Sequence, residues 1–472
     1  MKFPGFVGGS YEMDALTFDC QRTINMYPII SESGTSKSVA ALVSIPGYEL
    51  FATVGGGAIR GAKTVASGRA FVVSGLELYE INSDGTGTLR GTLSTATSRV
   101  SMAENGTQLM IVDGQYGYIY NMDTNVFAQI TDSDFPVCAT VTYQDGYFIV
   151  PETGTPNFYI SALYNGLSWD ALDFSNAMAN PDNLVSVTSD NGMLWMHGDI
   201  STEVFQNTGA AAFPFERVPG AIINSGCADA QTIIALDNSL FWLGIDSLGR
   251  GVVWRSQGLS IVRVSTNAIE QMIAASSDLT GSYAYAYHEN GHAFYCLNVN
   301  GLASTLCFDA STNQWHERTY RDTTTNEVMQ HRASCHFFFR QMNMLGDSRS
   351  GKIYRQSSQL YSYDGAAIHR ERVTPHAADE KRNITFSSLE LDVETGVGLQ
   401  SGQGSDPQIM MQYSNDGGRT WSSERWIPIG AVGQYRTRVA WNRCGSARDR
   451  VFRVKYTDPT QFQINDAYLN NG

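Results

Sequence analysis

The sequence predicts an all-β protein whose body is a β-propeller. Short runs of apolar or alternating residues are separated by Asn-Gly, Asp-Gly and Ser-Gly turns, which recur roughly every 8–12 residues. No helical period of comparable length competes with this pattern. The chain has 45 glycines in 472 residues and 11% aromatic residues, which together are typical of a turn-rich β protein.

The stretch Arg99–Ile130 shows the repeating unit most clearly. Turns at Asn105-Gly106, Asp113-Gly114 and Asp123-Thr124-Asn125 divide it into four short strands. Such turns between period-2 runs are the strongest local signal for antiparallel hairpins. Four strands in about thirty residues is the size of one propeller blade, and the same rhythm continues on both sides.

We divide the chain into three parts. Residues 1–50 are punctuated by glycine and proline and are expected to be an N-terminal arm, lying along the body or reaching a neighbour. Residues 51–382 are expected to be the propeller body, with about six or seven blades of roughly 45–55 residues. Residues 383–472 contain a compact run of strands, expected to be a β-sandwich-like region or a closing blade. Within the body, the crude 3–4 spacing of Tyr164–Asn183 predicts a helical or irregular insertion.

The composition limits the classes of function. A net charge of −14 argues against a protein that grips the nucleic-acid backbone across its surface. Seven cysteines without a CxxC spacing predict reduced, buried thiols in a cytosolic product. We see neither a signal-peptide pattern nor an apolar run near the ~18 residues of a membrane span. We therefore expect no membrane anchor, and synthesis in the cytoplasm.

The segment His288–His292 fits the HExxH pattern of zinc proteases, which requires both histidines on one face of a helix. Here the central Asn-Gly pair predicts a two-residue hairpin turn that pairs Glu289 with His292. His288 would then pair with Ala293, so the histidines would face opposite sides of the hairpin. A three-residue turn would bring them to one face, but would still supply only two ligands. We interpret the match as accidental.

A second group, His331, Cys335 and His336, also lacks the geometry of a metal site. His331 and Cys335 would align only on a helix, yet 334–339 reads as a strand, and a fourth ligand is missing. The sequence also has no nucleophile elbow, P-loop or dinucleotide fingerprint. We therefore predict no catalytic, cofactor-binding or metal-binding residues, no cofactor and no enzymatic activity.

Ser414–Trp421 fits the Asp-box, S-x-D-x-G-x-T-W. Asp416 is expected to accept backbone N–H groups within the turn, Gly418 to supply a permissive φ, and Trp421 to pack beneath. The box resembles a structural hairpin of sialidases, which also use an arginine triad, a tyrosine nucleophile and several boxes. One box leaves a propeller-type carbohydrate-binding protein or a sialidase-like glycosidase only as an alternative.

The stretch from Arg436 to Lys455 is locally basic in an acidic chain. Its cations are Arg436, Arg438, Arg443, Arg448, Arg450, Arg453 and Lys455. One interpretation is solvated strand faces, and the other is a contact patch for an acidic partner or for DNA passing nearby.

Several segments together resemble the packaged-DNA stabilisation proteins, or tail hub proteins, of short-tailed phages. They are Arg22–Pro28, Pro46-Gly47, Val100–Ala103 with Ile111–Gly114, the Asp-box, and Trp441–Phe452. The resemblance spans nearly the full length and is clearest at both ends. It implies a structural virion protein of a podovirus tail, a hub or nozzle below the portal and adaptor that helps to retain packaged DNA.

The resemblance also implies partners. They would be copies of the chain itself in a hexameric ring, the adaptor and other portal-proximal head-to-tail proteins, and the tail needle or the tailspike or fibre proteins. Packaged DNA would pass through the lumen without sequence recognition, and an acidic wall suits that passage. The resemblance transfers no catalytic residues.

Overall fold

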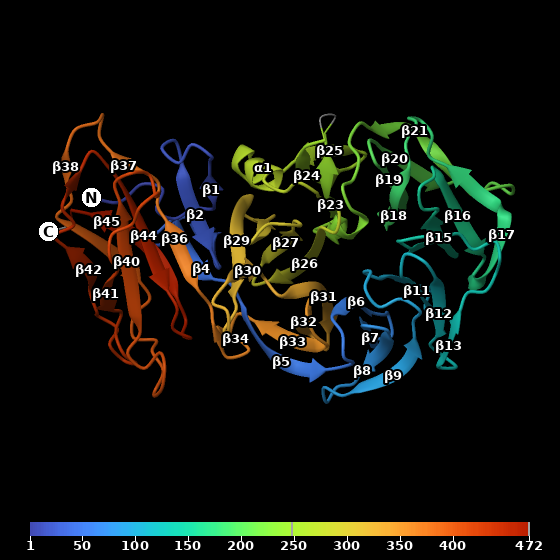
Figure 1. Ribbon diagram of the computed structural model, residues 1–472, viewed down its shortest axis with the longest axis horizontal. Coiled ribbons are helices and arrows are strands. Elements are labelled where there is room, and N and C mark those ends of the chain that lie inside the picture. Colours follow the sequence, from blue (N-terminus) through green and yellow to red (C-terminus); the bar gives the residue numbers. More distant parts are fainter. Residues whose placement is uncertain (247–248, 471–472) are drawn as a thin grey trace.

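The computed structural model describes residues 1–246 and 249–470, and nearly all of its regular structure is β-strand (Figure 1). The described residues contain one α-helix, α1 (Asn267–Ala274), and one 3-10 helix, Ala230–Thr232. Thr266 caps α1, because its hydroxyl accepts a hydrogen bond from the N–H of Ile269. The predicted all-β fold class is confirmed.

Six successive groups of four consecutive antiparallel strands follow one another around a ring, and the sixth group belongs to a larger sheet that continues into the neighbouring part of the molecule (Figure 1). Their strands are β6 (Ile59–Thr64), β7 (Ala70–Ser74), β8 (Glu77–Ile81), β9 (Gly87–Thr92); β10 (Ser101–Glu104), β11 (Gln108–Val112), β12 (Gly117–Asn121), β13 (Val126–Gln129); β14 (Thr142–Gln144), β15 (Tyr147–Pro151), β16 (Asn157–Ala162), β17 (Asn165–Asn176); β18 (Leu184–Asp190), β19 (Met193–Gly198), β20 (Thr202–Asn207), β21 (Phe215–Ile223); β22 (Ile234–Leu236), β23 (Ser239–Ile245), β24 (Gly251–Gln257), β25 (Ser260–Arg263); and β26 (Tyr283–Glu289), β27 (His292–Asn298), β28 (Thr305–Asp309), β29 (Gln314–Arg321). The stretch Arg99–Ile130 forms β10 to β13, as predicted.

A seventh blade closes the ring with one strand that precedes β6 in the sequence and others that follow β29. It contains β31 (Ala333–Phe339), β32 (Met342–Asp347), β33 (Lys352–Ser357) and β5 (Gly47–Thr53), extended by β34 (Ser362–Tyr363) and β35 (Ala366–Ala367), while β30 (Val328–Gln330) extends β29. Strand β5 runs antiparallel to β33, with Thr53 opposite Lys352. Closure removes the long open edge that such a sheet-rich chain would otherwise expose. Within the described residues, the ring is thus a seven-bladed β-propeller, in the predicted range of six or seven blades.

The core of the ring is divided among the interfaces between blades. Phe71 and Leu109 belong to a buried cluster between the first two blades, and Phe241 stacks on Tyr295 at 5.5 Å between the fifth and sixth. Burying each such side chain contributes about 1.5–3 kcal/mol. Alternating apolar residues on successive strands therefore hold neighbouring blades face to face.

A β-sandwich of two sheets stands beside the ring (Figure 1). One sheet contains β2 (Cys20–Ile24), β36 (Arg370–Val373), β44 (Asp449–Tyr456), β40 (Gln408–Ser414) and β41 (Arg425–Pro428); the other contains β3 (Met26–Ile30), β4 (Ala40–Ser44), β45 (Gln463–Leu469), β39 (Ser388–Val393) and β42 (Val439–Asn442). Short strands β1 (Tyr11–Glu12), β37 (Ala377–Ala378), β38 (Ile384–Thr385) and β43 (Ser446–Ala447) flank them. Leu42, Ile409 and Trp441 are buried between the sheets.

The first fifty residues differ from the expected arm, because they supply strands to both parts of the molecule. In the sandwich, Val43 of β4 lies opposite Gln463 of β45, and β5 begins within the same segment and enters the ring. The partners of these strands are hundreds of residues away, so no local pattern announces the pairing. At the other end, β36 and β37 pair with β44, so strands of the sandwich begin before residue 383.

The predicted helical or irregular insertion at Tyr164–Asn183 is wrong for most of its length, and only Tyr164, in a turn, and residues 177–183 lie outside regular structure. Residues 165–176 form β17, the outermost strand of the third blade, paired with β16 through two register shifts. An outer strand is covered on few sides, so Leu172 is 81% exposed and the segment lacks the usual alternation of buried and exposed residues. That irregularity resembled a helical spacing in the sequence.

Candidate functional site

The ring and the sandwich meet at strand β2, and we call the side chains of 5–25, β29 and β36 around it the junction. Ile24 of β2 pairs in parallel with Glu317 of β29, and Thr23 pairs antiparallel with Arg372 of β36. Figure 1 shows β2 between the sixth blade and the sandwich. Backbone hydrogen bonds therefore run without interruption from one part of the molecule to the other.

An ion pair between half-buried Arg22 and buried Glu317 lies across the junction. Arg22 donates from Nε to Glu317 Oε1 at 3.0 Å and from Nη2 to Oε2 at 2.5 Å. The Ser10 hydroxyl donates to the same carboxylate at 3.2 Å. Burial acts to raise the pKa of Glu317, but Arg22 outweighs burial and the pKa lies below its ordinary value. The two-pronged contact fixes the angle at which β2 meets β29.

Arg372 ties the first residues of the chain to the sandwich. Its guanidinium donates to the carbonyl oxygens of Phe6 at 2.7 Å, Gly5 at 2.8 Å and Gly9 at 3.0 Å. It also donates to Thr23 Oγ1 at 2.9 Å. Burial lowers the pKa of Arg372 to about 9, so the side chain remains protonated at neutral pH. An irregular segment thereby satisfies its carbonyl groups without joining a sheet.

Asn25 makes a third connection, within the segment Arg22–Pro28 that carries the N-terminal resemblance. Its backbone is left-handed, with φ of 54°, which asparagine tolerates. Its Nδ2 donates to the carbonyl oxygens of Thr319 at 3.1 Å and His369 at 2.8 Å. Its Oδ1 accepts from the Thr319 N–H at 2.9 Å. The segment is thus a structural joint between β2, β29 and the chain before β36.

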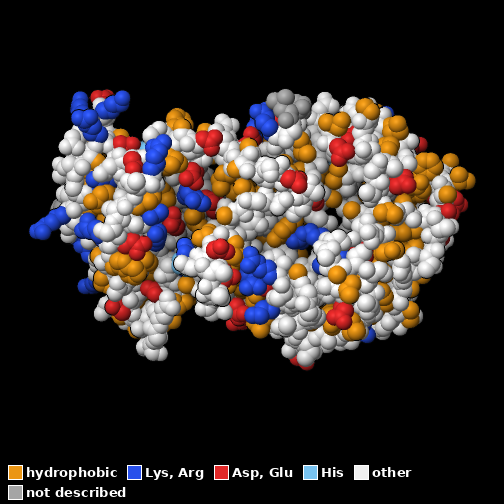
Figure 2. Space-filling model, viewed as in Figure 1, with side chains coloured by type: hydrophobic (Ala, Val, Ile, Leu, Met, Phe, Trp, Pro, Cys, Tyr) orange, Lys and Arg blue, Asp and Glu red, His pale blue; other side chains and the backbone are white. Residues whose placement is uncertain are grey.

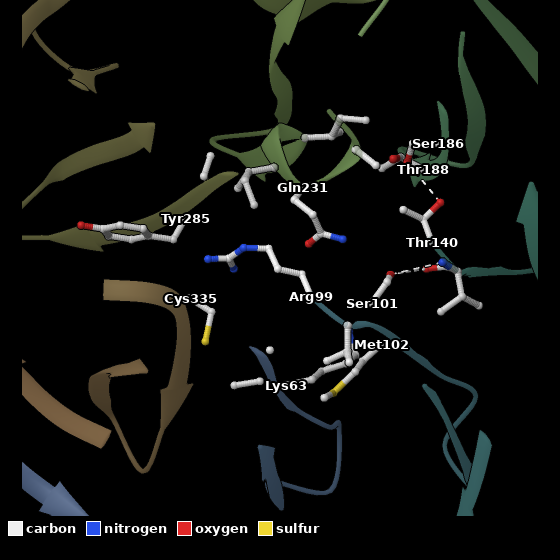
Figure 3. A pocket seen from close by; sticks show the side chains of 18 of the residues that line it. Lys63, Arg99, Ser101, Met102, Thr140, Ser186, Thr188, Gln231, Tyr285 and Cys335 are labelled. Atoms are coloured by element: carbon white, nitrogen blue, oxygen red, sulfur yellow. Dashed lines mark hydrogen bonds between the residues drawn. The ribbon is translucent and has the colours of Figure 1, made fainter. Parts of the chain in front are cut away.

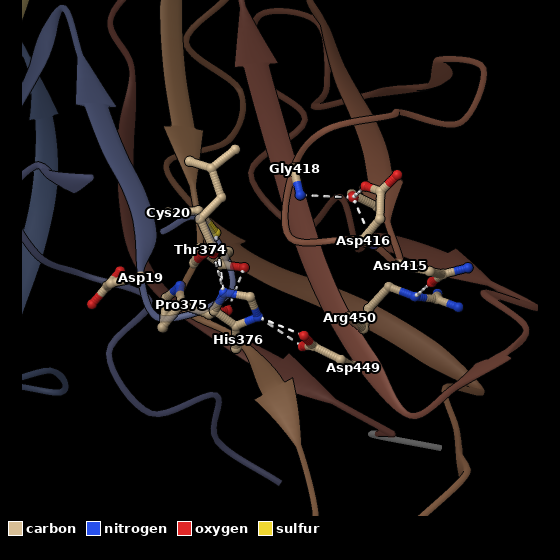
Figure 4. Close-up of polar contacts among 12 residues, drawn as sticks. Asp19, Cys20, Thr374, Pro375, His376, Asn415, Asp416, Gly418, Asp449 and Arg450 are labelled. Carbon is tan, nitrogen blue, oxygen red and sulfur yellow. Dashed lines mark hydrogen bonds and ion pairs between the residues drawn. The ribbon is translucent and has the colours of Figure 1, made fainter. Parts of the chain in front are cut away.

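His376 clamps the N-terminal segment at the start of β2 (Figure 4). Its Nδ1 lies 2.8 Å from the Asp449 carboxylate, and its Nε2 lies 2.8 Å from the Leu16 carbonyl oxygen and 3.6 Å from Cys20 Sγ. The contact with Cys20, together with the bond to Asp449, raises the pKa of His376 to about 10.

The arrangement Cys20–His376–Asp449 resembles a nucleophilic triad in outline but not in protonation. A carbonyl and a carboxylate both accept hydrogen bonds, so both ring nitrogens of His376 carry protons at neutral pH. A doubly protonated imidazole has no free lone pair with which to take a proton from Cys20. Cys20 is also only 3% exposed. The cluster is a clamp between distant segments.

The Asp-box forms the turn that the sequence predicts, next to this clamp (Figure 4). Asp416 accepts from the Thr420 N–H at 2.9 Å and from the Thr420 hydroxyl at 2.6 Å. Gly418 has φ of 94°, and Trp421 packs partly buried against Cys20 and its neighbours. Since the carboxylate is engaged within its own turn, the box is a structural element of the sandwich.

The HExxH segment is the hairpin between β26 and β27, with the predicted register. Glu289 lies opposite His292, and His288 lies opposite Ala293. Asn290 and Gly291 have φ of 51° and 80°, the conformation of a two-residue hairpin turn. His292 Nδ1 lies 2.7 Å from Asp309 Oδ2. The histidines therefore belong to opposite faces of the hairpin.

The second group of candidate ligands is also separated. Cys335 and His336 lie on β31, and His336 Nε2 lies 2.9 Å from Asn343 Oδ1. His331 precedes that strand and its Nδ1 lies 3.0 Å from the Tyr285 hydroxyl. Within 1–246 and 249–470, no group of three or more His, Cys, Asp or Glu side chains is placed to hold a metal ion.

The basic stretch from Arg436 to Lys455 does not form one patch. Arg450 is buried and donates to Asn415 Oδ1 at 2.7 Å, and Lys455 pairs with Glu424 at 3.1 Å. Arg438 pairs with Glu390 at 2.9 Å. Arg436, Arg443 and Arg448 are exposed. Part of the stretch thus stabilises the sandwich, and Arg436, Arg438, Arg443 and Arg448 are its exposed positive charges.

Sequence reasoning missed the residues that build the junction. Arg372, Glu317 and His376 each contact groups that are far away in the chain. Their one local signal is a charged side chain in an otherwise strand-like segment, such as Arg372 in the strand Arg370–Val373. A charge at a position expected to be buried requires a partner, which is the signal that was available.

Two family models match the chain. The family described as bacteriophage P22 Gp10, beta-propeller, matches residues 1–360, and that described as bacteriophage P22 Gp10, beta-sandwich, matches residues 369–471. No curated protein matches the chain. No helix in the described ranges is long and apolar enough to cross a membrane.

Among solved structures, the chain is similar to the N-terminal domain of Nup159, with 9% identity and a TM-score of 0.44 over 71% of this chain and 98% of that one. It is also similar to the β-propeller domain of Myceliophteria thermophila Cps50 (Swd1), with 6% identity and a TM-score of 0.41 over 66% and 99%. Similarity at this level concerns the fold alone.

Proposed function

Because the chain belongs to the bacteriophage P22 Gp10 family, a family of structural proteins of the phage tail, we propose that it is the hub or nozzle of a short tail. In this role it attaches below the portal and adaptor and keeps packaged DNA in the head. The observation that carries the proposal is that the two family models together span both the ring and the sandwich. The protein acts as a structural part and not as an enzyme.

The junction supports a role under mechanical load. A hub that resists the pressure of packaged DNA must keep its parts in a fixed relation. Here one strand belongs to a sheet that crosses both parts, and Glu317, Arg372 and Asn25 each join segments far apart in the chain. Buried charged groups with all their partners in place resist displacement, because removing one partner leaves the other desolvated and unpaired.

The outer surface supports assembly with further copies, for which we propose a hexameric ring. Apolar side chains gather near β17 at the edge of the molecule (Figure 2). Leu172, Met178 and Tyr164 are 81%, 59% and 63% exposed. A stable interface buries roughly 1,200–2,000 Å² or more, and such side chains are the ones it covers. The adaptor, needle and tailspike or fibre proteins are the other proposed partners.

The chemistry of the surface supports a conduit for DNA. A net charge of −14 repels a polyanion, so DNA can pass the assembled tail without being held. The proposal therefore includes no sequence recognition of DNA.

The test is deletion of the gene from the phage, followed by addition of the purified protein to the resulting particles. We expect heads that package DNA and then lose it, measured as DNA accessible to nuclease, and recovery of infectious particles on addition. The double variant Leu172→Glu, Met178→Glu should fold and fail to restore retention. The matched control Leu259→Glu, at an exposed leucine of the fifth blade, should restore it.

A different outcome would favour the alternative of a propeller-type carbohydrate-binding protein or glycosidase. If the deletion gives full, stable heads with normal tails that fail only to degrade host glycans, the hub proposal is refuted. The single Asp-box gives that alternative no support, because its carboxylate is bonded within the turn.

A further inference from the structure

The inner strands of the seven blades line a cavity of about 430 Å³ at the centre of the ring, which is partly open to solvent (Figure 3). Figure 2 shows the ring hollowed at this place, with basic side chains beside the hollow. The volume is that of a site for a small ligand. DNA in the proposed tail would therefore pass between subunits and not through this ring.

The charge of the cavity wall is opposite to that of the protein. Arg60, Lys63 and Arg99 line it, and its described lining contains no aspartate or glutamate. The whole chain has 46 acidic against 32 basic residues, so a wall with cations alone departs from the composition. A small cleft lined by one sign of charge attracts ligands of the opposite sign.

The three cations are not equivalent. The Arg60 guanidinium is occupied, because it donates to the Gly75 carbonyl at 2.8 Å, the Thr95 hydroxyl at 2.9 Å and the Ser98 hydroxyl at 3.1 Å. Arg99 makes one hydrogen bond to a carbonyl, from Nη1 to Ser334 at 2.9 Å.

Arg99 is held in place without a neutralising partner. Its guanidinium carbon lies 3.5 Å from the centre of the Tyr283 ring, a cation–π contact that fixes its plane. Within the described ranges, neither Arg99 nor Lys63 forms an ion pair with a carboxylate. Asp229 and Glu104 are the acids whose charge reaches them; Asp229 accepts two backbone N–H groups, and Glu104 accepts one through Oε1. Burial consequently lowers the pKa of both Arg99 and Lys63.

The opposite wall offers hydroxyl donors (Figure 3). Thr142 Oγ1 accepts from the Ser189 N–H at 3.1 Å, and Thr140 Oγ1 accepts from the Val187 N–H at 3.4 Å. A hydroxyl whose oxygen already accepts from the backbone has its hydrogen left to donate. Neither of these hydroxyls donates to another described residue. The lining of the cavity thus combines two cations without a carboxylate partner and, on another wall, hydroxyl donors.

We propose that this cavity is a binding site for a small oxyanion ligand, one that bears carboxylate or phosphate groups, with Arg99 as its main contact and Lys63 as its second. The Arg99 guanidinium matches the two oxygens of such a group, and Thr140 and Thr142 complete the donor set. The carboxylate could belong to a free metabolite or to an acidic segment of another protein that enters the ring. This site goes beyond the structural role in the tail and does not depend on it.

The test is titration calorimetry of the full-length protein at fixed ionic strength with citrate, inorganic phosphate, a triglutamate peptide and, as control, chloride. We expect saturable binding of at least one oxyanion with a Kd of roughly 1 mM or tighter. Arg99→Gln should weaken it at least about tenfold, and Lys63→Gln should weaken it by a smaller factor. Arg436→Gln removes the same charge from an exposed site on the sandwich and should leave Kd unchanged.

The outcomes distinguish the two sources of the ligand and can refute the site. Tighter binding of triglutamate assigns the carboxylate to a protein segment, and tighter binding of citrate or phosphate assigns the ligand to a small molecule. No saturable binding of any oxyanion, or an equal loss in Arg436→Gln, refutes the site. If Arg99→Gln does not fold, Lys63→Gln decides alone: weaker binding supports the proposal and unchanged binding refutes it.

Discussion

Arginine performs opposite tasks in the junction and in the cavity of the ring. In the junction, Arg372 donates hydrogen bonds to carbonyl oxygens of residues 5–9, and Arg22 donates to the Glu317 carboxylate. In the cavity, Arg99 has one carbonyl partner and an aromatic ring beneath it. Arg372 is buried, and Arg22 and Arg99 are half-buried. The junction arginines use their donors for contacts within the fold, whereas Arg99 retains donors with which it can bind a ligand.

The difference teaches how to separate stability from binding among charged residues that are not exposed. A buried cation with all its donors used is expensive to remove, since its acceptors are then left without partners. A cation that already lacks a partner is inexpensive to remove, since its own desolvation is relieved. The two regions should therefore respond differently to the same substitution.

The largest effect is expected for Arg372→Met. The change leaves the carbonyl oxygens of Gly5, Phe6 and Gly9 without their donor, and the bond to Phe6 is buried. We expect the free energy of unfolding to fall by about 3–5 kcal/mol, measured by urea denaturation. Arg436→Met, at an exposed arginine, is the control and should change it by less than about 0.5 kcal/mol. Equal stability of the two variants would contradict our account of the junction.

Gly418→Val tests whether the sandwich depends on backbone geometry as well as on charge. A β-branched residue at φ of 94° is strained, and its Cβ would lie 3.4 Å from Trp421. We expect a loss of about 1–3 kcal/mol, seen as a lower melting temperature. Gly56→Val is the comparison, since nothing lies within 4 Å of a Cβ there. An unchanged melting temperature in Gly418→Val would contradict the positive φ at Gly418 in the Asp-box turn.

The His376 clamp predicts a pH dependence. Its pKa is about 10 in the folded protein against an ordinary value of 6.5, so its contribution is complete below pH 6.5 and is lost as the pH rises toward 10. We expect His376→Gln to cost about 1–2 kcal/mol near pH 6, and the difference from wild type to shrink with rising pH. His288→Gln, at an exposed histidine, should show no such trend. A difference that is constant from pH 6 to pH 10 would rule out the doubly protonated clamp.

The smallest effect on stability is expected for Arg99→Met. The lost bond to Ser334 is offset by relief of an unpaired, desolvated charge, so the free energy of unfolding should change by less than about 1 kcal/mol. Denaturation beside Arg372→Met under the same conditions gives the contrast directly. A loss as large as that of Arg372→Met would place Arg99 among the structural arginines.

Local signals in the sequence were sufficient for the hairpins and insufficient for the long-range pairings. The turn at Asn290-Gly291 determined the register of Glu289 and His292, because a two-residue turn permits few alternatives. The Asp-box was predictable for the same reason. Strand β17 was missed because an exposed outer strand lacks a buried face. No local sequence pattern indicates the pairing of β4 with β45.

The candidate sites show the same limit. The absence of zinc geometry in His288–His292 follows from the turn itself, so the sequence could exclude that geometry. The cavity could not be predicted, because Lys63 and Arg99 become neighbours only when different blades face the same axis. A charged residue at the start of an inner strand was the available hint.

The closure of the ring by β5 has a consequence for folding during synthesis. Strand β5 ends at Thr53, but its partner β33 begins at Lys352. A ribosome that adds roughly 5–20 residues per second needs on the order of 15–60 s to make the roughly 300 residues between them. During that interval β5 is a finished strand with an unpaired edge, open to the wrong neighbour. In a cell that makes many copies at once, the order of translation therefore affects whether β5 pairs with β33 of its own chain.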